Sequence, residues 1–227
     1  MIDKQFNLML SDLQKLPRRN VDGKRLYETP DGSFYPSVTT ITGQMTKKAI
    51  QEWRARVGEK EANRVTKKAS SRGTSIHKLC EHYILNNMDD VKVMPSNKEM
   101  FDAMSNHLRD HVDNIHGVES FLYSDFLRTA GQVDCIAEYD GVLSVIDFKT
   151  SKKRKPESWI QNYFVQAAAY SFMFEERTNI QIPQLVIMIG VDGDDEPQVF
   201  TKNTKERNQY LLQFLDLRKQ YDEASDS

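Results

Sequence analysis

The chain has 227 residues, of which 39% are hydrophobic and 28% charged, and its formal net charge is -2 at pH 7. This composition is typical of a folded globular protein and excludes an intrinsically disordered chain, and no apolar run approaches the roughly 18 residues that a membrane span requires. The net charge argues against a protein that coats nucleic acid over its whole surface, and the two cysteines, Cys80 and Cys135, are too few for a zinc ribbon or a four-cysteine iron–sulfur cluster.

Two regions are expected, an N-terminal lobe over residues 1–70 and a core over residues 71–227, which together form one compact unit. Residues 1–22 are weakly amphipathic and are interpreted as a helix or, alternatively, as an arm. A Pro-Asp-Gly sequence between two β-like runs predicts a small hairpin over residues 25–35.

Two helices are predicted in the rest of the lobe. Ser37 or Thr39 could cap a short helix that Gly43 would end. Residues 47–69 are rich in charge and have apolar residues at helical spacing, which favours a longer helix. The apolar face of this helix would consist of Ile50, Trp53 and Val57.

The core would begin with a helix over residues 71–85, for which Thr74 or Ser75 is a suitable N-cap. His77 and Glu81 are four residues apart and therefore project side by side along the edge of the buried face. A histidine in such a position is more often structural than a ligand. The buried stripe of this helix would be Ile76, Leu79, Cys80, Tyr83 and Ile84.

A second amphipathic helix is predicted over residues 97–116, with His107 and His111 on its surface. A strand is expected over residues 118–127. Residues 128–130 would then turn the chain into a β-hairpin.

The hairpin over residues 131–149 carries the densest chemistry of the sequence. An Asp-Gly pair, Asp140 and Gly141, between two β-rich runs predicts a type I′ turn, because both central residues of that turn need positive φ. The turn sets the strand register, which places Asp134 opposite Asp147. Like charges opposite each other are destabilising, so a fold retains such a pair mainly where a cation lies between the carboxylates.

Lys149 lies two residues after Asp147 and therefore on the same face of the strand. A solvated strand face is the simpler interpretation of an Asp-Lys pair. However, apolar residues on both faces predict that this strand is buried, and buried acids need partners. These apolar residues are Leu143, Val145, Ile146 and Phe148.

After the hairpin, a long helix, two strands and a final helix are predicted. Pro156 suits the first turn of a helix that would extend to Arg177. The later elements would be strands over residues 184–191 and 198–201 and a helix over residues 204–221. The core order is therefore α, β, β, β, α, β, which predicts an α/β (α+β) fold with a mixed central sheet flanked by helices.

Several motifs stand in a fixed order on these elements: Tyr35-Pro36-Ser37-Val38-Thr39, Arg72-Gly73-Thr74 with His77 and Glu81, Gly131-x-x-Asp134, Asp147-Phe148-Lys149-Thr150, and Gln166-x-x-x-Tyr170. In this order they resemble the PD-(D/E)xK nuclease superfamily. Within it they are most similar to the RecB-like exonuclease branch, including phage exonucleases and mitochondrial genome maintenance exonucleases. The resemblance covers residues 34–202 and implies a restriction-endonuclease-like core. Asp147 departs from the pattern, because the superfamily frequently has Glu there.

The resemblance implies a divalent metal site that hydrolyses phosphodiester bonds. Its ligands would be His77, Asp134, Asp147 and the backbone carbonyl of Phe148. Oxygen ligands suit Mg²⁺, and an added imidazole suits Mn²⁺. Lys149 would orient the attacking water or stabilise the transition state.

Further roles are implied around this site. Gln166 and Tyr170 would orient DNA or Lys149. Glu81 could be a hydrogen-bonding partner of His77, and Glu119 on the preceding strand is a rival carboxylate for the site. The sequence has no Gly-rich phosphate loop, so no nucleotide cofactor is expected.

DNA is the expected partner. Two basic clusters, residues 152–155 and Lys67, Lys68 with Arg72, flank the predicted site as phosphate backbones require, although a charge run is often only a solvated surface. Aromatic residues such as Trp159 could stack on single-stranded bases or pack in the core. The residues expected to contact DNA are Arg72, Thr150, Lys152, Lys153, Arg154, Lys155, Ser37 and Tyr35.

The sequence therefore predicts a metal-dependent DNA exonuclease that acts on single-stranded or frayed ends in replication, recombination or repair. The alternatives are a structure-specific endonuclease of the same superfamily and a non-catalytic DNA-binding or recombination module. The complete set of Asp134, Asp147 and Lys149 favours an enzyme. No signal or transit peptide is recognised in the first residues, so a cytoplasmic phage or bacterial protein is expected, without membrane attachment and with replication or recombination proteins as possible partners.

Overall fold

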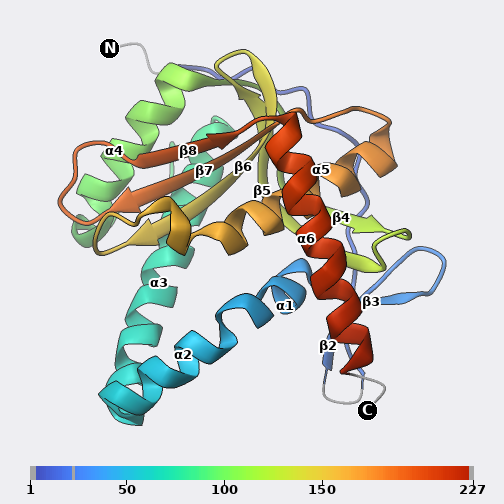
Figure 1. Ribbon diagram of the computed structural model, residues 1–227. Coiled ribbons are helices and arrows are strands. Elements are labelled where there is room, and N and C mark those ends of the chain that lie inside the picture. Colours follow the sequence, from blue (N-terminus) through green and yellow to red (C-terminus); the bar gives the residue numbers. More distant parts are fainter. Residues whose placement is uncertain (1–3, 22–23, 225–227) are drawn as a thin grey trace.

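A five-stranded mixed sheet forms the centre of the protein, and helices cover both of its faces (Figure 1). The computed structural model describes residues 4–21 and 24–224. In chain order the elements are β1 (Arg18–Val21), β2 (Lys24–Glu28), β3 (Phe34–Pro36), α1 (Val38–Thr42), α2 (Gln44–Val57), α3 (Glu59–Ile84), α4 (Pro95–His111), β4 (Val112–Ser124), β5 (Thr129–Tyr139), β6 (Val142–Ser151), the 3₁₀ helix η1 (Glu157–Trp159), α5 (Gln161–Thr178), β7 (Gln184–Val191), β8 (Gln198–Lys202) and α6 (Thr204–Glu223).

The topology of the main sheet agrees with the sequence prediction. Its strand order is β4-β5-β6-β7-β8, and only β6 and β7 are parallel neighbours. Parallel neighbours need a crossover connection, and α5 supplies it. The order α, β, β, β, α, β is therefore confirmed, and with it the predicted fold class. The strands β1, β2 and β3 form a separate small sheet that includes the predicted hairpin.

The main sheet separates two hydrophobic clusters. One cluster lies between the sheet and the helices α1, α5 and α6, and the other lies between the sheet and the helices α3 and α4. All five apolar residues predicted for residues 71–85 are buried in the second cluster. Because β6 is covered on both faces, its central residues from Ser144 to Phe148 are all buried, as the apolar run predicts.

The β5–β6 hairpin has the predicted turn, and it has the predicted register only as far as Cys135–Ile146, so the expected pair of Asp134 and Asp147 is not part of the ladder. Asp140 and Gly141 have φ values of 50° and 76°, as a type I′ turn requires. The strands pair in a regular ladder from Tyr139–Val142 to Cys135–Ile146.

The N-terminal segment is an extended arm, so its interpretation as a helix is wrong. The Met9 N–H donates to the Ile115 carbonyl and the Ser11 N–H donates to the His116 carbonyl, both at 2.8 Å. This arm extends the edge of β4, and its Phe6 side chain is buried against α3 and α4. The apolar residues of the segment thus serve tertiary packing rather than a helix face.

The start of α3 differs from the prediction. The helix begins at Glu59, directly after Gly58, whose φ of 84° separates it from α2. Thr74 and Ser75 consequently lie inside a helix and not at an N-cap. The Ser75 hydroxyl donates to the backbone carbonyl one turn earlier, at 3.0 Å. The predicted division between lobe and core falls inside this helix, and it stays a prediction.

The end of α4 also differs. The helix ends at His111, because the chain from Val112 onward pairs with β5. His107 is half-buried and not a surface residue: its ring stacks on that of His111 with centroids 4.2 Å apart, and its Nε2 lies 2.9 Å from the Tyr139 hydroxyl. Burial, followed by the neighbouring charge of His111, lowers the pKa of His107.

Three smaller differences concern the turn before β5, the helix after Pro156 and the apolar face of α2. The turn before β5 consists of residues 125–128, so Thr129 already belongs to a strand. The helix predicted after Pro156 is divided into η1 and α5. None of the side chains of α2 is buried, and Ile50 on its predicted apolar face is 49% exposed.

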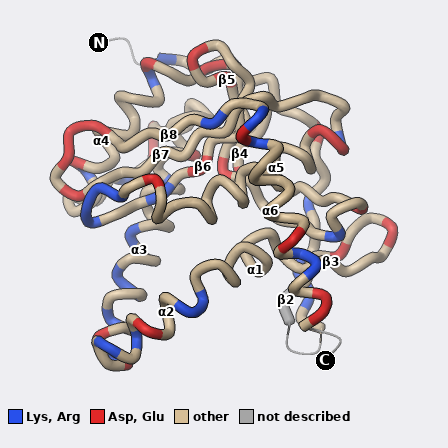
Figure 2. The backbone as a smooth tube through the Cα atoms, viewed as in Figure 1, with Lys and Arg blue, Asp and Glu red and all other residues tan. Residues whose placement is uncertain are grey.

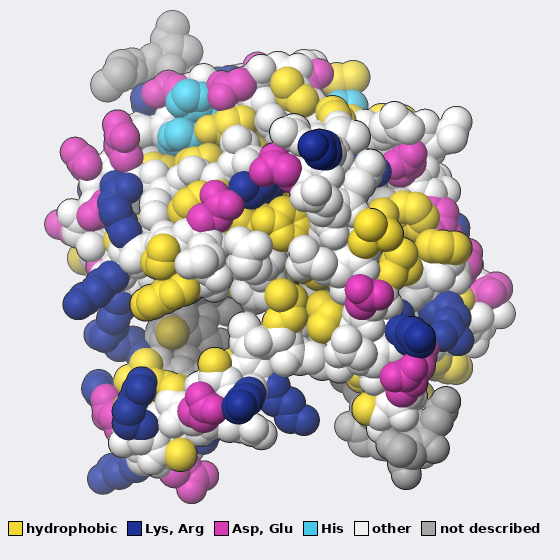
Figure 3. Space-filling model, in the orientation of Figure 1, with side chains coloured by type: hydrophobic (Ala, Val, Ile, Leu, Met, Phe, Trp, Pro, Cys, Tyr) yellow, Lys and Arg dark blue, Asp and Glu magenta, His cyan; other side chains and the backbone are white. Residues whose placement is uncertain are grey.

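Positive charge collects on two neighbouring helices. Lys and Arg residues recur along α2 and α3 (Figure 2), and their side chains gather over the same helices at the lower left of the space-filling view (Figure 3). In the part of the chain that the structure describes, no helix is long and apolar enough to cross a membrane.

Candidate active site

The alternation of side chains along β5 breaks at Asp134. Val133 packs in the cluster beneath α5, yet Cys135, two residues later, packs in the cluster beneath α3 and α4. The register of the neighbouring pairs places Glu119 of β4 opposite Asp134. Glu119 has a φ of 47°, in the left-handed region that non-glycine residues adopt at a cost of about 1 kcal/mol or more. The distortion brings two carboxylates to the α3 side of the sheet.

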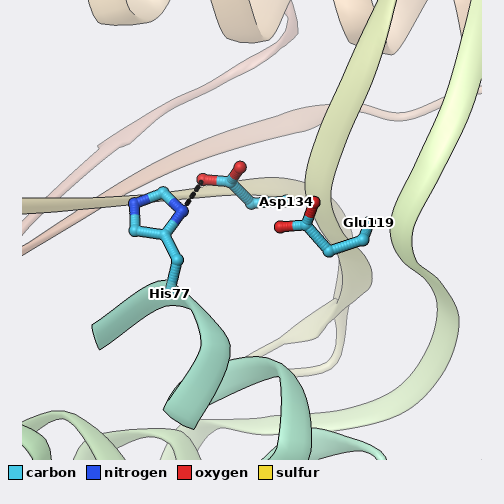
Figure 4. A group of neighbouring side chains, drawn as sticks. All are labelled: His77, Glu119 and Asp134. Carbon is cyan, nitrogen blue, oxygen red and sulfur yellow. Dashed lines mark ion pairs between the residues drawn. The ribbon is translucent and has the colours of Figure 1, made fainter. Parts of the chain in front are cut away.

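These two carboxylates lie beside His77 of α3 (Figure 4). One possible ligand atom from each of Glu119, Asp134 and His77 lies within 4.8 Å of the other two. Asp134 Oδ2 is 3.6 Å from His77 Nδ1, and the same oxygen accepts a hydrogen bond of 2.8 Å from the Phe148 N–H. Two carboxylates and an imidazole form a donor set that fits Mn²⁺ and, with water ligands, Mg²⁺.

Burial and the nearby negative charges shift the pKa of the Glu119 carboxyl. Burial, followed by the charges of Asp134 and Glu81, raises the pKa of the Glu119 carboxyl to about 7, while Arg18 acts in the opposite direction. A cation beside the carboxylates would favour their charged forms. The carboxyl faces an open pocket with a volume of about 390 Å³. This pocket is lined by Gly73, Thr74, His77, Lys78, Glu81 and Glu119.

Asp147 and Lys149 form a buried ion pair on β6. Asp147 is only 2% exposed, and its Oδ1 accepts a hydrogen bond of 3.1 Å from the Gln166 amide of α5. Burial raises the pKa of Asp147, and the Lys149 ammonium opposes that shift. Lys149 Nζ also lies 5.0 Å from the centre of the Tyr163 ring. Asp147 therefore faces α5, whereas Asp134 faces His77 of α3, so the prediction that the two acids lie opposite each other on one face is wrong.

Tyr170 of α5 lies beneath β5 at Gly131, close to Asp134 in the chain. It is 3% exposed, and burial raises the pKa of its hydroxyl. A Cβ atom on Gly131 would come within 2.7 Å of the Tyr170 hydroxyl oxygen. Only glycine allows this approach without a shift of the ring, which explains the glycine three residues before Asp134.

The residues predicted to contact DNA occupy different surroundings. Ser37 is 5% exposed and caps α1, because its Oγ accepts a hydrogen bond of 3.0 Å from the Thr40 N–H. The Tyr35 hydroxyl donates to Asp125 Oδ1 at 3.2 Å. The four basic residues after β6 extend outward: Lys152, Lys153 and Arg154 are exposed, Lys155 is half-buried, and Arg154 pairs with Asp194 at 2.8 Å.

A basic cleft runs along α3. We use this name for a hollow of about 810 Å³ between α3, the start of α4 and the loop after β7, together with an adjoining hollow of about 230 Å³ that reaches Thr150 and Lys152. Arg72 lines both hollows and forms an ion pair with Asp192. Glu99 also lines the larger hollow. The cations of the cleft are Arg64, Lys67, Lys68, Arg72 and Lys152.

The family model of the PD-(D/E)XK nuclease superfamily matches residues 92–225, which include every element from α4 to α6. The chain belongs to this superfamily. The match contains the strands that carry Glu119, Asp134 and the Asp147–Lys149 pair, and the helix that carries Gln166.

Two curated relatives of this chain are mitochondrial genome maintenance exonuclease 1 of Homo sapiens, 32% identical over 157 residues, and that of Xenopus tropicalis, 29% identical over 172 residues. The alignments cover 63% and 70% of this chain but 45% and 49% of the relatives, so the chain spans about half of their length. A solved structure of a protein from Eubacterium rectale overlaps 65% of this chain and 68% of its own, at 11% identity and a TM-score of 0.40.

The grouping of acids around His77 differs from the one expected from the sequence. Glu119, considered only as a rival, lies with His77 and Asp134, whereas Asp147 contacts Lys149 and Gln166. The register of β4 and β5 could have identified Glu119, because the pairs run regularly from Ser124–Thr129 at the turn to Val118–Cys135. The sequence prediction missed it because it placed the turn at residues 128–130, whereas the chain turns at residues 125–128.

Proposed function

We propose that this chain is a metal-dependent DNA exonuclease. The observation that carries the proposal is the grouping of His77, Glu119 and Asp134 at one pocket, next to the buried pair of Asp147 and Lys149. Such a donor set binds divalent cations, and a lysine beside it suits chemistry on an anionic phosphate. The names of the curated relatives support exonuclease as the type of nuclease.

The proposed metal ligands are His77, Glu119 and Asp134. Asp147 and the backbone carbonyl of Phe148 stay proposed as ligands from the sequence, and Asp147 would have to release its present partners to bind. A bound Mg²⁺ or Mn²⁺ would supply Lewis-acid chemistry, lowering the pKa of a water molecule and neutralising charge on the scissile phosphate.

In this proposal Lys149 supplies a positive charge and a proton donor, and Gln166 and Tyr170 position the groups around it. Burial lowers the pKa of Lys149, but the carboxylates of Asp147 and Asp134 raise it by more, so Nζ stays protonated at neutral pH. A protonated Nζ can donate to a phosphate oxygen and stabilise the charge that develops in the transition state. Gln166 holds the Asp147 carboxylate through a hydrogen bond, and Tyr170 packs against Gly131 beneath β5.

We propose Glu81 as the residue that orients the His77 imidazole, because both line the same pocket. The basic cleft and the exposed residues Lys152 and Lys153 would bind the phosphate backbone of the substrate. Trp159 is 73% exposed and could stack on an unpaired base, which supports single-stranded or frayed DNA as the substrate. A role in replication, recombination or repair agrees with the relatives' names, which refer to genome maintenance.

The test is digestion of end-labelled single-stranded, duplex and closed circular DNA with Mg²⁺, Mn²⁺ or EDTA. Lys149→Met is the informative variant, since the remaining Asp147 carboxyl can take up a proton. An Asp147→Ala change would instead leave the buried Lys149 ammonium without its ion-pair partner, at a cost of about 3–5 kcal/mol in stability. Lys149→Met and Asp134→Asn should each reduce the cleavage rate by roughly 100-fold or more.

Lys98→Met is the matched control, because Lys98 lies on the surface of α4 in an ion pair with Asp102. It should cleave DNA like the wild type. Intact substrates with both metals, or undiminished cleavage by Lys149→Met, would refute the proposal. Cuts in closed circles would identify an endonuclease, and binding without cleavage would identify a non-catalytic module.

A further inference from the structure

The small N-terminal sheet places an arginine beside the candidate active site. Arg18 of β1 pairs with Tyr27 of β2, and its guanidinium carbon lies 5.3 Å from the centre of the Tyr27 ring and 6.0 Å from that of Phe121. Tyr27 is 4% exposed, so one of these rings is fixed in the core. Cation–π contacts with two rings restrict the guanidinium to one place.

Two hydrogen bonds through the Gln132 side chain connect this guanidinium to the backbone of Glu119. Arg18 Nη2 donates to Gln132 Oε1 at 2.8 Å, and Gln132 Nε2 donates to the Glu119 carbonyl at 2.9 Å. Gln132 precedes Asp134 by two residues on β5, which corresponds to about 7 Å along a strand. Arg18 is therefore held at a short distance from the carboxylates, on the side of the sheet that also faces His77.

Arg18 is also an exposed cation without an acid partner. It forms no ion pair with any acid between residues 4 and 224 for which the structure describes the side chain. A guanidinium has five N–H donors, and only the bond to Gln132 is made within this part of the chain. The adjacent Arg19 differs, because its Nε donates to Glu28 Oε2 at 2.7 Å.

We propose that Arg18 binds a backbone phosphate of the nucleic acid, next to the phosphate that the candidate active site holds. The fork of a guanidinium matches the geometry of phosphate oxygens, and its fixed position reduces the entropy lost on binding. A phosphate contact carries no sequence information, so Arg18 orients the strand whatever its sequence. That the bound phosphate belongs to the strand being cleaved rests on the proposed nuclease function.

The test compares Arg18→Met and Arg18→Lys with the matched control Arg19→Met. Methionine retains the apolar packing on Tyr27 and Phe121 but removes the charge. Binding of a fluorescent single-stranded oligonucleotide is measured in EDTA over a series of salt concentrations. Arg18→Met should bind about tenfold more weakly, with a salt slope smaller by about 0.7. Arg18→Lys should recover part of the affinity and the full slope.

Thermal unfolding of each variant establishes that the fold is retained, and Arg18→Lys provides the comparison if Arg18→Met is unstable. Equal binding by Arg18→Met and wild type, an equal loss in Arg19→Met, or wild-type protein that does not bind DNA would overturn the proposal. The two proposals fail separately. Cleavage by the wild type with unchanged binding by Arg18→Met refutes only the role of Arg18, and weaker binding by Arg18→Met without any cleavage by the wild type refutes only the nuclease activity.

Discussion

Glu119 is unfavourable in the metal-free protein for two reasons, its left-handed backbone and its carboxyl close to Asp134 and Glu81. Glu119→Gln removes the charge and should raise the stability of the metal-free protein by roughly 1 kcal/mol, which is less than the pKa shift alone suggests because the carboxyl is partly exposed to solvent. Added Mn²⁺ should raise the Tm of the wild type, because a ligand that binds only the folded state stabilises it. Thermal unfolding in EDTA and in Mn²⁺ measures both effects.

The same thermal unfolding measurements test whether Glu119 is a metal ligand or has only a structural role. Glu119→Gln should show a much smaller rise in Tm with Mn²⁺ than the wild type. An equal rise in both proteins would exclude Glu119 as a ligand and leave His77 and Asp134 to hold the metal. Lys98→Met is again a suitable control, because it should reproduce the Mn²⁺ response of the wild type.

His107 gives a pH-dependent contribution to stability. Its folded pKa is lower than the usual 6.5, mainly through burial and then through His111, while Asp140, Glu196 and Asp110 partly oppose the shift. The unfolded chain therefore binds a proton more readily than the folded protein does. Stability from His107 is fully present above pH 6.5 and is lost as the pH falls through the folded pKa.

His107→Gln should consequently lose less stability than the wild type between pH 7 and pH 5, as measured by denaturant unfolding at each pH. Glutamine can still hydrogen-bond the Tyr139 hydroxyl that His107 contacts. A parallel decline of the two proteins over this range would contradict the assignment.

The sequence predicts the placement of individual residues correctly where their neighbours in the structure are also close in the chain. The turn at Asp140 and Gly141 determines the ladder as far as Cys135, and the sequence specifies it fully. The direction in which Glu119 points depends on a distorted β4, and the direction in which Asp147 points depends on α5, which is nearly twenty residues away. These placements result from packing between elements, which hydrophobic pattern and turn chemistry do not specify.

Among the elements, the short helix α1 is determined by its cap. The Ser37 Oγ accepts the Thr40 N–H, and Val38 and Ile41 are fully buried in the cluster beneath α5. Ser37→Ala should lower the free energy of unfolding by about 1 kcal/mol, because it leaves a helix N–H without its acceptor. Urea unfolding measures the loss. Ser37→Asn, which can still cap, should retain most of the stability, and equal losses in the two variants would argue against the capping role.

Element boundaries were only partly predictable from capping residues. Ser37 and Thr39 were both candidate N-caps of the short helix, and Ser37 is the residue that caps α1. Thr74 and Ser75 look the same in sequence, yet Ser75 satisfies its hydroxyl within α3. Val112 and Ile115 fit a helical period, but both are buried strand residues of β4. An apolar residue at a given spacing indicates burial more reliably than it indicates the type of element.

Across the whole molecule, charge is distributed unevenly although the net charge is only -2. The carboxylates of Glu119 and Asp134 lie beside His77 of α3, and the basic cleft lies along α3 and the start of α4. The sequence predicts both clusters, but not that one helix carries them both. It also does not predict that β1 lies beside the candidate active site, because the position of the N-terminal sheet depends on contacts more than one hundred residues apart, such as that between Arg18 and Gln132.

The charge distribution leads to a prediction about salt. If the basic cleft holds the DNA backbone, replacing both Lys67 and Lys68 by Ala should reduce the salt slope of binding to single-stranded DNA by about 1.4, or about 0.7 for each lost phosphate contact. Both lysines line the larger hollow, and neither forms an ion pair within the described ranges. Lys205 and Lys219 of α6 are the control pair, since their replacement removes the same formal charge from a helix on the other face of the sheet, where Lys219 pairs with Glu223 at 3.9 Å. Equal slopes for the two double variants would show that binding responds to total charge and not to the cleft.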